Sequence, residues 1–126
     1  MRLGDLRRFC LSLPGAAESV QWGNEHVYKV GGKMFAIISM DQRRFAGLVL
    51  KVTDDSFHIL TRENGIIPAP YLARAGWVMI ERRDILPADQ LRAYIVRSHG
   101  LVVAKLPKKL RTELAASSGA KARTAP

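Results

Sequence analysis

The sequence HVYKVGGKMFAIISM at residues 26–40 decides the fold. Two runs rich in β-forming residues, 26–30 and 33–40, flank the dipeptide Gly31-Gly32. Both central residues of a type I′ turn need a positive φ, which glycine adopts without steric cost. We therefore predict a β-hairpin. Because the apolar positions of residues 33–40 are nearly continuous, we expect this strand to be central and covered on much of both faces.

Further short extended segments surround this hairpin. Residues 19–22 precede the turn dipeptide Gly23-Asn24, and residues 46–52 follow a polar connection. Four consecutive short segments joined by tight turns indicate an antiparallel meander. Residues 77–82 predict one more strand, because their side chains alternate between two faces.

Helices are predicted before and after the meander. The first covers about residues 3–13 and ends at Pro14-Gly15, which stops a helix. The remaining predicted segments are helices at 53–63, at 87–98 and from Pro107 onward, a loop at 66–75, and a stretch at 101–106 compatible with a short turn of helix.

This order of elements predicts an α+β domain with an antiparallel sheet of about five strands flanked by helices. The chain has 126 residues, of which 48% are hydrophobic and 25% charged, as in an ordinary globular domain. That composition excludes a wholly disordered chain and a disulfide-built scaffold. We expect one domain at residues 1–116 and a flexible tail at residues 117–126.

The composition also bears on the location of the protein. A membrane span needs about 18 apolar residues, and the longest apolar run, from Met34 to Met40, is strand-sized. Charges near the N-terminus interrupt the apolar stretch that a signal peptide needs. Cys10 is the single cysteine, so no internal disulfide forms. We expect a soluble cytoplasmic protein that does not bind membranes, with a monomer favoured.

Several motifs together resemble the MmcQ/YjbR family. The resemblance covers about residues 3–112, and the hairpin sequence Val30-Gly31-Gly32-Lys33-Met34-Phe35-Ala36 is its most specific part. The other matching motifs are Leu11-Ser12-Leu13-Pro14-Gly15, Trp22-Gly23, Leu50-Lys51-Val52, Pro68-Ala69-Pro70-Tyr71, Trp77-Val78 and Ala104-Lys105-Leu106-Pro107-Lys108-Lys109.

The resemblance implies a small α+β domain with a frataxin-like antiparallel sheet. It also implies DNA binding by a double-wing arrangement, without catalytic activity. The loop before Trp77 has one basic residue, Arg74, in the segment Ala73-Arg74-Ala75-Gly76.

The residues themselves contain no catalytic or metal-binding pattern. His26, His58 and His99 lie on separate predicted elements, without the paired spacing of a metal site. Cys10 lies on an apolar helix face, where a buried inert thiol is the default. We therefore expect neither an enzyme nor a cofactor or metal.

Charge is the unusual feature of the chain. Twenty Lys and Arg against eleven Asp and Glu give a net charge of +9, which favours a polyanionic partner and nucleic acid first. Basic residues at turns can hold phosphates, or they can merely solvate the sheet edges. The candidate nucleic-acid-binding residues are Lys29, Lys33, Arg43, Arg44, Arg74, Arg82, Arg83, Lys105, Lys108 and Lys109.

Lys108 and Lys109 occupy the first turn of the last predicted helix if Pro107 is its first residue. Cations there oppose the helix dipole, while the free N–H groups of a first turn bind anions. This favours a phosphate at the helix start, unless acidic side chains from elsewhere neutralise the lysines or the helix begins earlier.

An alternative function remains open. The sheet face, or the loop between Pro68 and Trp77, can serve as a protein-interaction or small-ligand module. Of the aromatic residues Trp22, Phe35, Tyr71 and Trp77, which can stack on bases or fill the core, we expect Tyr71 to be the most exposed.

Overall fold

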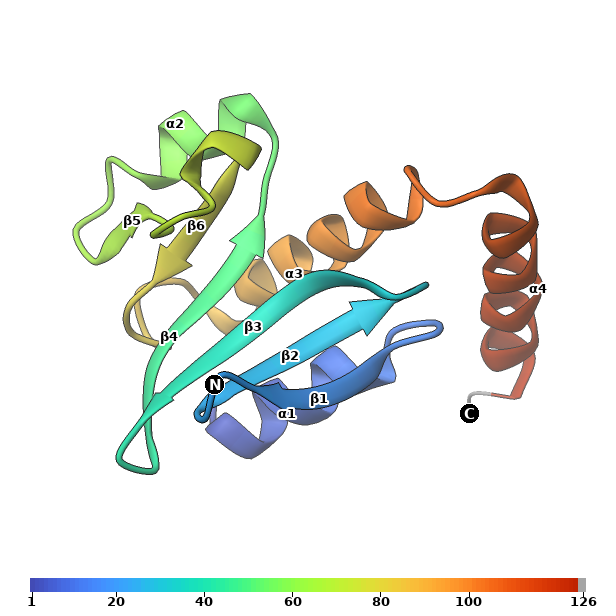
Figure 1. Cartoon of the computed structure of the whole chain (residues 1–126), viewed down its shortest axis with the longest axis horizontal. Helices are drawn as coiled ribbons and strands as arrows, with labels where there is room; N and C mark the ends of the chain where they lie inside the picture. Colours follow the sequence, from blue (N-terminus) through green and yellow to red (C-terminus); the bar gives the residue numbers. More distant parts are fainter. Residues whose placement is uncertain (125–126) are drawn as a thin grey trace.

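The computed structural model describes the backbone of residues 1–124 and the side chains of residues 1–116. A six-stranded antiparallel sheet forms the centre, with strand order β1-β2-β3-β4-β6-β5. The elements are α1 (Leu3–Ser12), β1 (Ala17–Gln21), β2 (Glu25–Val30), β3 (Lys33–Asp41), β4 (Arg44–Lys51), α2 (Asp54–Leu60), β5 (Ile66–Pro68), the 3₁₀ turn η1 (Ala73–Ala75), β6 (Trp77–Ile80), α3 (Ala88–Val103) and α4 (Lys108–Thr124). Helices α1 and α3 lie behind the sheet in Figure 1, which looks onto the other face.

The predicted hairpin is confirmed. Strand β2 pairs with β3 across Gly31 and Gly32, whose φ values are +58° and +80°. Strand β3 pairs with β4 on its other side, so it is central. A Cβ atom on Gly31 would lie 2.7 Å from Cδ1 of Leu106, so this turn packs against the connection between α3 and α4.

A β-bulge lies near the start of β3. Tyr28 faces Ala36 and Lys29 faces Met34, so Phe35 has no partner on β2 and its side chain joins that of Ala36 in the helix-side core. The buried Ser98 hydroxyl of α3 donates to the Phe35 carbonyl (2.6 Å) and accepts from the Lys51 N–H (3.0 Å). One side chain of a helix thus satisfies two backbone groups of the sheet.

The sheet has a very different covering on its two faces. The helix-covered face joins side chains of α1, α2 and α3 to strand residues such as Tyr28, Ile38 and Leu50, most of them fully buried. The open face has a smaller cluster, formed by Val27, Ile37, Val49, Ala69 and Trp77. The segment around β5 and η1 contributes Ala69, Leu72 and Trp77 to this second cluster.

Two sequence predictions were wrong in detail. Residues 66–68 form the edge strand β5 rather than a loop, because Ile66 is buried and pairs with Ile80; proline is tolerated in an edge strand. Helix α3 is continuous through Gly100 to Val103, instead of stopping at residue 98. Burial of Ile95 and Val102 on one helix face outweighs the cost of about 1 kcal/mol for a helical glycine.

The last helix begins one residue later than predicted. Pro107 precedes it, and its carbonyl accepts the first helical hydrogen bond from the Arg111 N–H (3.1 Å). A flexible tail was expected at residues 117–126, whose side chains the structure does not describe. The backbone is described as far as Thr124, the last residue of α4, and residues 125–126 lie outside the described part.

Candidate binding surfaces

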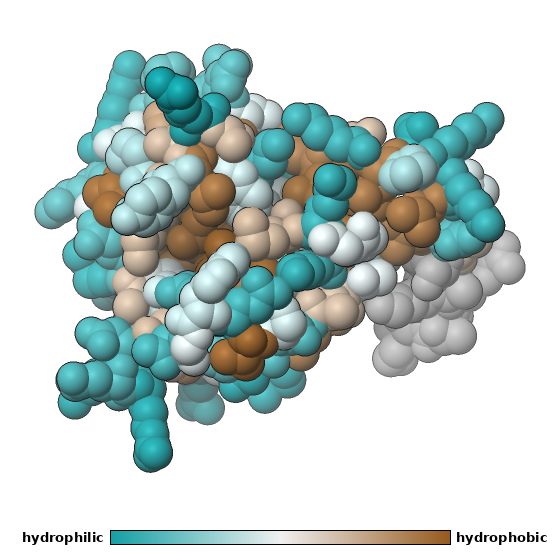
Figure 2. Space-filling view, in the orientation of Figure 1, coloured by the Kyte–Doolittle hydropathy of each residue, from teal (hydrophilic) through white to brown (hydrophobic). Residues whose placement is uncertain are grey.

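Arginines from distant parts of the chain meet at one end of the sheet. The β3–β4 turn carries Arg43 and Arg44, and Arg82 and Arg83 follow β6. Together with Arg2 they line a hollow of about 960 Å³, which also contains Asp5, Glu81 and Asp84. Figure 2 shows hydrophilic side chains at the corner where the β3–β4 turn projects in Figure 1.

These arginines differ in their partners. Arg82 Nε lies 3.6 Å from Asp84 Oδ1. Arg83 donates to the Met1 carbonyl (3.1 Å) and lies 5.4 Å from the centre of the Phe45 ring. Arg43 and Arg44 are exposed and have no ion pair within residues 1–116. The turn therefore offers two arginines that are free to hold anions.

The remaining predicted residues lie toward the opposite end of the sheet. Lys29 and Lys33 flank the β2–β3 turn, which packs against Leu106. Lys105 immediately precedes that residue, and Lys108 and Lys109 begin α4, whose first turn has no acidic residue. The predicted residues thus form two groups, as expected from the positions of the two hairpin turns.

A second hollow, of about 630 Å³, brings three of the basic residues together. Lys51, Arg74 and Lys105 line it, with Asp54 and His58 of α2. Burial and the neighbouring Lys105 ammonium group lower the pKa of Lys51 from its ordinary value. Lys51 was not among the residues predicted from the sequence, although its place two residues after Val49 puts both side chains on one face of β4.

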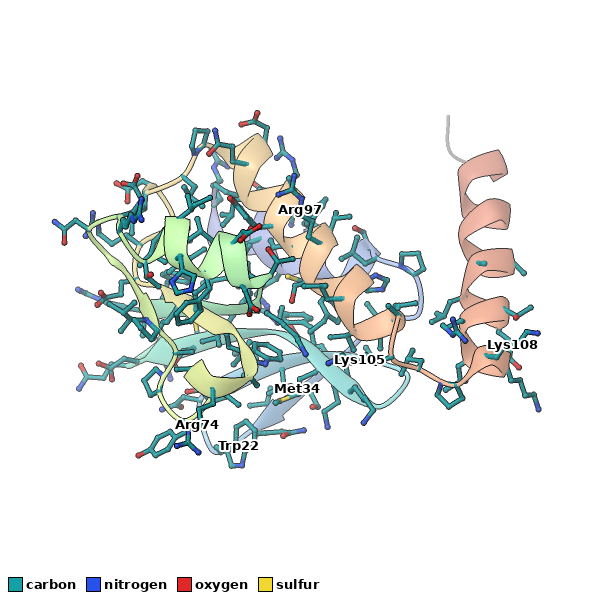
Figure 3. All side chains as sticks on the ribbon, turned by 90° about the horizontal axis from the view of Figure 1, so that it is seen from above. Trp22, Met34, Arg74, Arg97, Lys105 and Lys108 are labelled. Atoms are coloured by element: carbon teal, nitrogen blue, oxygen red, sulfur yellow. The ribbon has the colours of Figure 1, made fainter. Side chains whose placement is uncertain are left out.

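An apolar groove of about 620 Å³ crosses the open face. Its floor is formed by Met34, Ile37, Val49 and Met79, and its walls include Leu72. Figure 2 shows hydrophobic surface between the β5–β6 segment and the sheet. In Figure 3, Trp22, Met34 and Arg74 lie on the side of the sheet away from α3 and Arg97.

Two aromatic residues stand at the rim of this groove. Tyr71 is completely exposed and Trp22 is 70% exposed, whereas Phe35 and Trp77 are core residues. The expectation that Tyr71 is the most exposed aromatic is confirmed. Trp22 and Tyr71 also have positive φ values, +51° and +66°, in the left-handed region that costs a non-glycine residue about 1–2 kcal/mol.

A partly buried polar cluster joins α1 to the sheet on the helix-covered face. The Glu18 carboxylate accepts hydrogen bonds from Arg7 Nη2 (3.2 Å) and from the Tyr28 hydroxyl. His26 Nδ1 lies 3.8 Å from the same carboxylate. Burial raises the pKa of Glu18, but the hydrogen bonds from Tyr28 and Arg7 outweigh this and lower it. The cluster holds the edge of the sheet to α1.

His99 and Cys10 have structural surroundings. His99 is buried, and its Nε2 lies 2.8 Å from the Pro14 carbonyl. Burial raises the pKa of the Cys10 thiol to about 12, so the thiolate is not available at neutral pH. Among the residues that the structure describes, no group of three His, Cys, Asp or Glu side chains is placed to hold a metal ion.

A family model and two relatives match most of this sequence. The YjbR family model matches residues 11–101, from the end of α1 to α3. The chain belongs to the YjbR family. The YjbR proteins of Escherichia coli strains K12 and O157:H7, which are described as uncharacterized, are each 26% identical over 114 residues, covering 88% of this chain and 95% of theirs.

Two solved structures have a similar fold. A crystal structure of a Deinococcus radiodurans protein with a DUF419 domain superposes with a TM-score of 0.79 at 29% identity, covering 90% of this chain and 87% of that one. A Pseudomonas syringae protein superposes with a TM-score of 0.63 at 17% identity, covering 78% and 96%, and shares the fold. No helix in the described part of this YjbR-family chain is long and apolar enough to cross a membrane.

Proposed function

We propose that this YjbR-family protein is a non-catalytic DNA-binding protein that holds the phosphate backbone at the two basic ends of its sheet. The observation that carries the proposal is the gathering of Arg43, Arg44, Arg82 and Arg83 around one hollow, although the two pairs are almost 40 residues apart in sequence. Guanidinium groups without acidic partners, such as those of Arg43 and Arg44, are suited to bidentate phosphate binding. The net charge of +9 attracts a polyanion to either end.

The fold sets the spacing of the two ends. Strand β3 has nine residues and connects the β2–β3 turn to the β3–β4 turn. At a rise of about 3.3 Å per residue, the two turns are about 30 Å apart. One duplex that contacts both turns must therefore extend over about nine base pairs, at 3.4 Å per pair.

The length and salt dependence of binding test this proposal. We expect fluorescence anisotropy with random duplexes of 6, 10, 14 and 18 base pairs to show a rise in affinity between 6 and 14 pairs. For a long duplex, four or five phosphate contacts predict an affinity loss of roughly 150- to 500-fold between 50 and 200 mM salt. Undetectable binding to duplexes and single strands at 50 mM salt and micromolar protein refutes the proposal.

Matched double variants identify the contributing end. Arg43→Gln with Arg44→Gln, and Lys108→Gln with Lys109→Gln, each remove two charges from one end. Arg92→Gln with Arg97→Gln removes two charges from the exposed side of α3 as a control. We expect each of the first two pairs to reduce the magnitude of the log–log salt slope by about 1.8, and the control to change it less. If all three double variants show equally small decreases in the salt slope, DNA is held by diffuse electrostatic attraction and neither end is a specific contact site.

A second candidate function is a ligand-binding module on the open face. The favouring observation is the apolar groove between Trp22 and Tyr71, because a concave apolar site of this volume is of the size that small ligands occupy. Titration of the protein with a fluorescent apolar probe tests it, and absence of binding to the native state contradicts it.

A further inference from the structure

The groove on the open face and the hollow beside it are neighbours. Leu72 lines the groove, while Ala73 and Arg74, the next residues along the chain, line the hollow. In β4, Val49 lines the groove and Lys51 lines the hollow, and the two residues are two positions apart on one side of the strand. Two strand positions span about 7 Å, so one small molecule can reach from the apolar floor to the basic residues.

The basic end of this composite site has more cationic than anionic side chains. Lys51, Arg74 and Lys105 have no ion pair among the described residues, and Asp54 is the only acidic residue that lines the hollow. Lys51 is half-buried and close enough to Lys105 for the two ammonium groups to repel each other. A bound anion would relieve this repulsion, since each nearby cation is more stable when paired.

The apolar end carries conformational strain at its rim. Trp22 and Tyr71 hold left-handed backbone conformations while their side chains are largely exposed, so packing of the rings compensates little of the cost. Backbone strain of this kind concentrates at ligand sites, where the surrounding structure holds a side chain ready for contact. Exposed aromatic rings on both sides of an apolar floor are suited to cover a flat or alkyl body.

We propose that the open face binds a small amphiphilic anion, with its apolar body in the groove between Trp22 and Tyr71 and its carboxylate, sulfonate or phosphate group on Lys51, Arg74 and Lys105. This inference rests on the second candidate function and is independent of DNA binding. The volume of the groove favours a small molecule, and the charge of the hollow requires that molecule to be anionic.

A pair of probes with similar aromatic bodies tests the two ends separately. The probes are 1-anilinonaphthalene-8-sulfonate, which is anionic, and N-phenyl-1-naphthylamine, which is its neutral counterpart. Fluorescence titration of the native protein should show one site for each, with the anionic probe binding more tightly. Lys51→Gln with Lys105→Gln should weaken the anionic probe about tenfold, the equivalent of about 1.4 kcal/mol, and leave the neutral probe unchanged.

The controls use residues outside the composite site. Lys108→Gln with Lys109→Gln removes the same charge from α4, where Figure 3 shows Lys108 far from Trp22 and Arg74. This variant should change the affinity of neither probe by more than twofold. Tyr71→Ala should weaken both probes without loss of cooperative unfolding, because the ring is fully exposed.

Each other outcome overturns a defined part of the proposal. If the Lys51→Gln/Lys105→Gln variant and the Lys108→Gln/Lys109→Gln variant bind the anionic probe with equal affinity, the anion site at Lys51 and Lys105 is refuted. The proposal for the groove is unaffected by that result. If neither probe binds the native protein, the groove and the ligand class are both refuted. If neither binds and sedimentation shows a dimer that Tyr71→Ala dissociates, a second copy of the chain covers the open face instead.

Discussion

The two faces of the sheet differ in how completely they are covered. On the helix-covered face, Tyr28, Phe35, Ile38 and Leu50 are fully buried under α1 and α3. On the open face, Met34 and Met79 are only partly buried, and a groove of about 620 Å³ remains beside them. Apolar surface that is packed away from water stabilises the fold, whereas a concave apolar surface that remains open can bind a ligand. The comparison indicates that one face maintains the fold and the other is available for a ligand.

The largest expected difference between the faces comes from adjacent residues of β3. Ile38 points to the helix-covered face and Ile37 to the open face. Ile38→Ala should lower the free energy of unfolding by about 4 kcal/mol, and Ile37→Ala by about 2 kcal/mol, because a site beside a groove already lacks neighbours on one side. Urea denaturation of both variants measures the difference, and equal losses would contradict the distinction between the faces.

Serine substitutions provide a smaller test of the same comparison. Ser98→Ala leaves the buried Lys51 N–H and Phe35 carbonyl without their hydroxyl partner and should cost about 1–3 kcal/mol. Ser39→Ala removes a hydrogen bond to the Glu25 carboxylate on the half-buried open face and should cost less than about 1 kcal/mol. Chemical denaturation distinguishes the two, and a Ser39 loss as large as that of Ser98 would show that the open face is equally closed.

Acid should destabilise the helix-covered face through His99. Burial lowers the pKa of this histidine below its ordinary value of 6.5, although the Pro14 carbonyl partly opposes the shift. The unfolded chain therefore binds this proton at a higher pH than the folded chain does. The stability that neutral His99 contributes is complete above about pH 6.5 and is lost as the pH falls toward the folded pKa.

Denaturation midpoints at pH 7.5 and 5.5 measure this effect. His99→Gln should have a shallower pH dependence over this interval than the wild type. His58→Gln replaces an exposed histidine of α2 and serves as the control, with the wild-type dependence expected. If both variants keep the wild-type pH dependence of the denaturation midpoint, the prediction for His99 is wrong.

The smallest expected effect has the opposite sign and concerns the open face. Tyr71→Gly should raise the free energy of unfolding by about 0.5–1 kcal/mol, because glycine adopts the φ of +66° without strain but loses more chain entropy on folding. Tyr71→Ala retains the strain and should show no gain. Thermal unfolding measures both variants, which should bind the apolar probes equally weakly. A destabilised Tyr71→Gly variant would mean that the ring supports the fold.

Local sequence patterns were sufficient for the hairpin and most helices. Two glycines in succession were enough to predict the β2–β3 turn, because a type I′ turn requires a positive φ at both central positions. The continuous apolar run of β3 indicated a central strand for a similar local reason. By contrast, β5 was missed, since its three residues form a strand only because β6 lies beside them.

The binding surfaces depended on contacts between distant residues. Local sequence predicted the basic residues at each turn, but not that Arg43 and Arg44 share a hollow with Arg82 and Arg83. Local sequence also did not predict that Lys51 and Lys105 line the same hollow. They meet because α3 ends beside the last residue of β4, which is a contact between distant parts of the chain. The sequence by itself thus determined the strands, the turns and the excess of positive charge, which are properties of neighbouring residues. Only the tertiary structure decided which sheet face remained open, because that depends on where α1 and α3 pack.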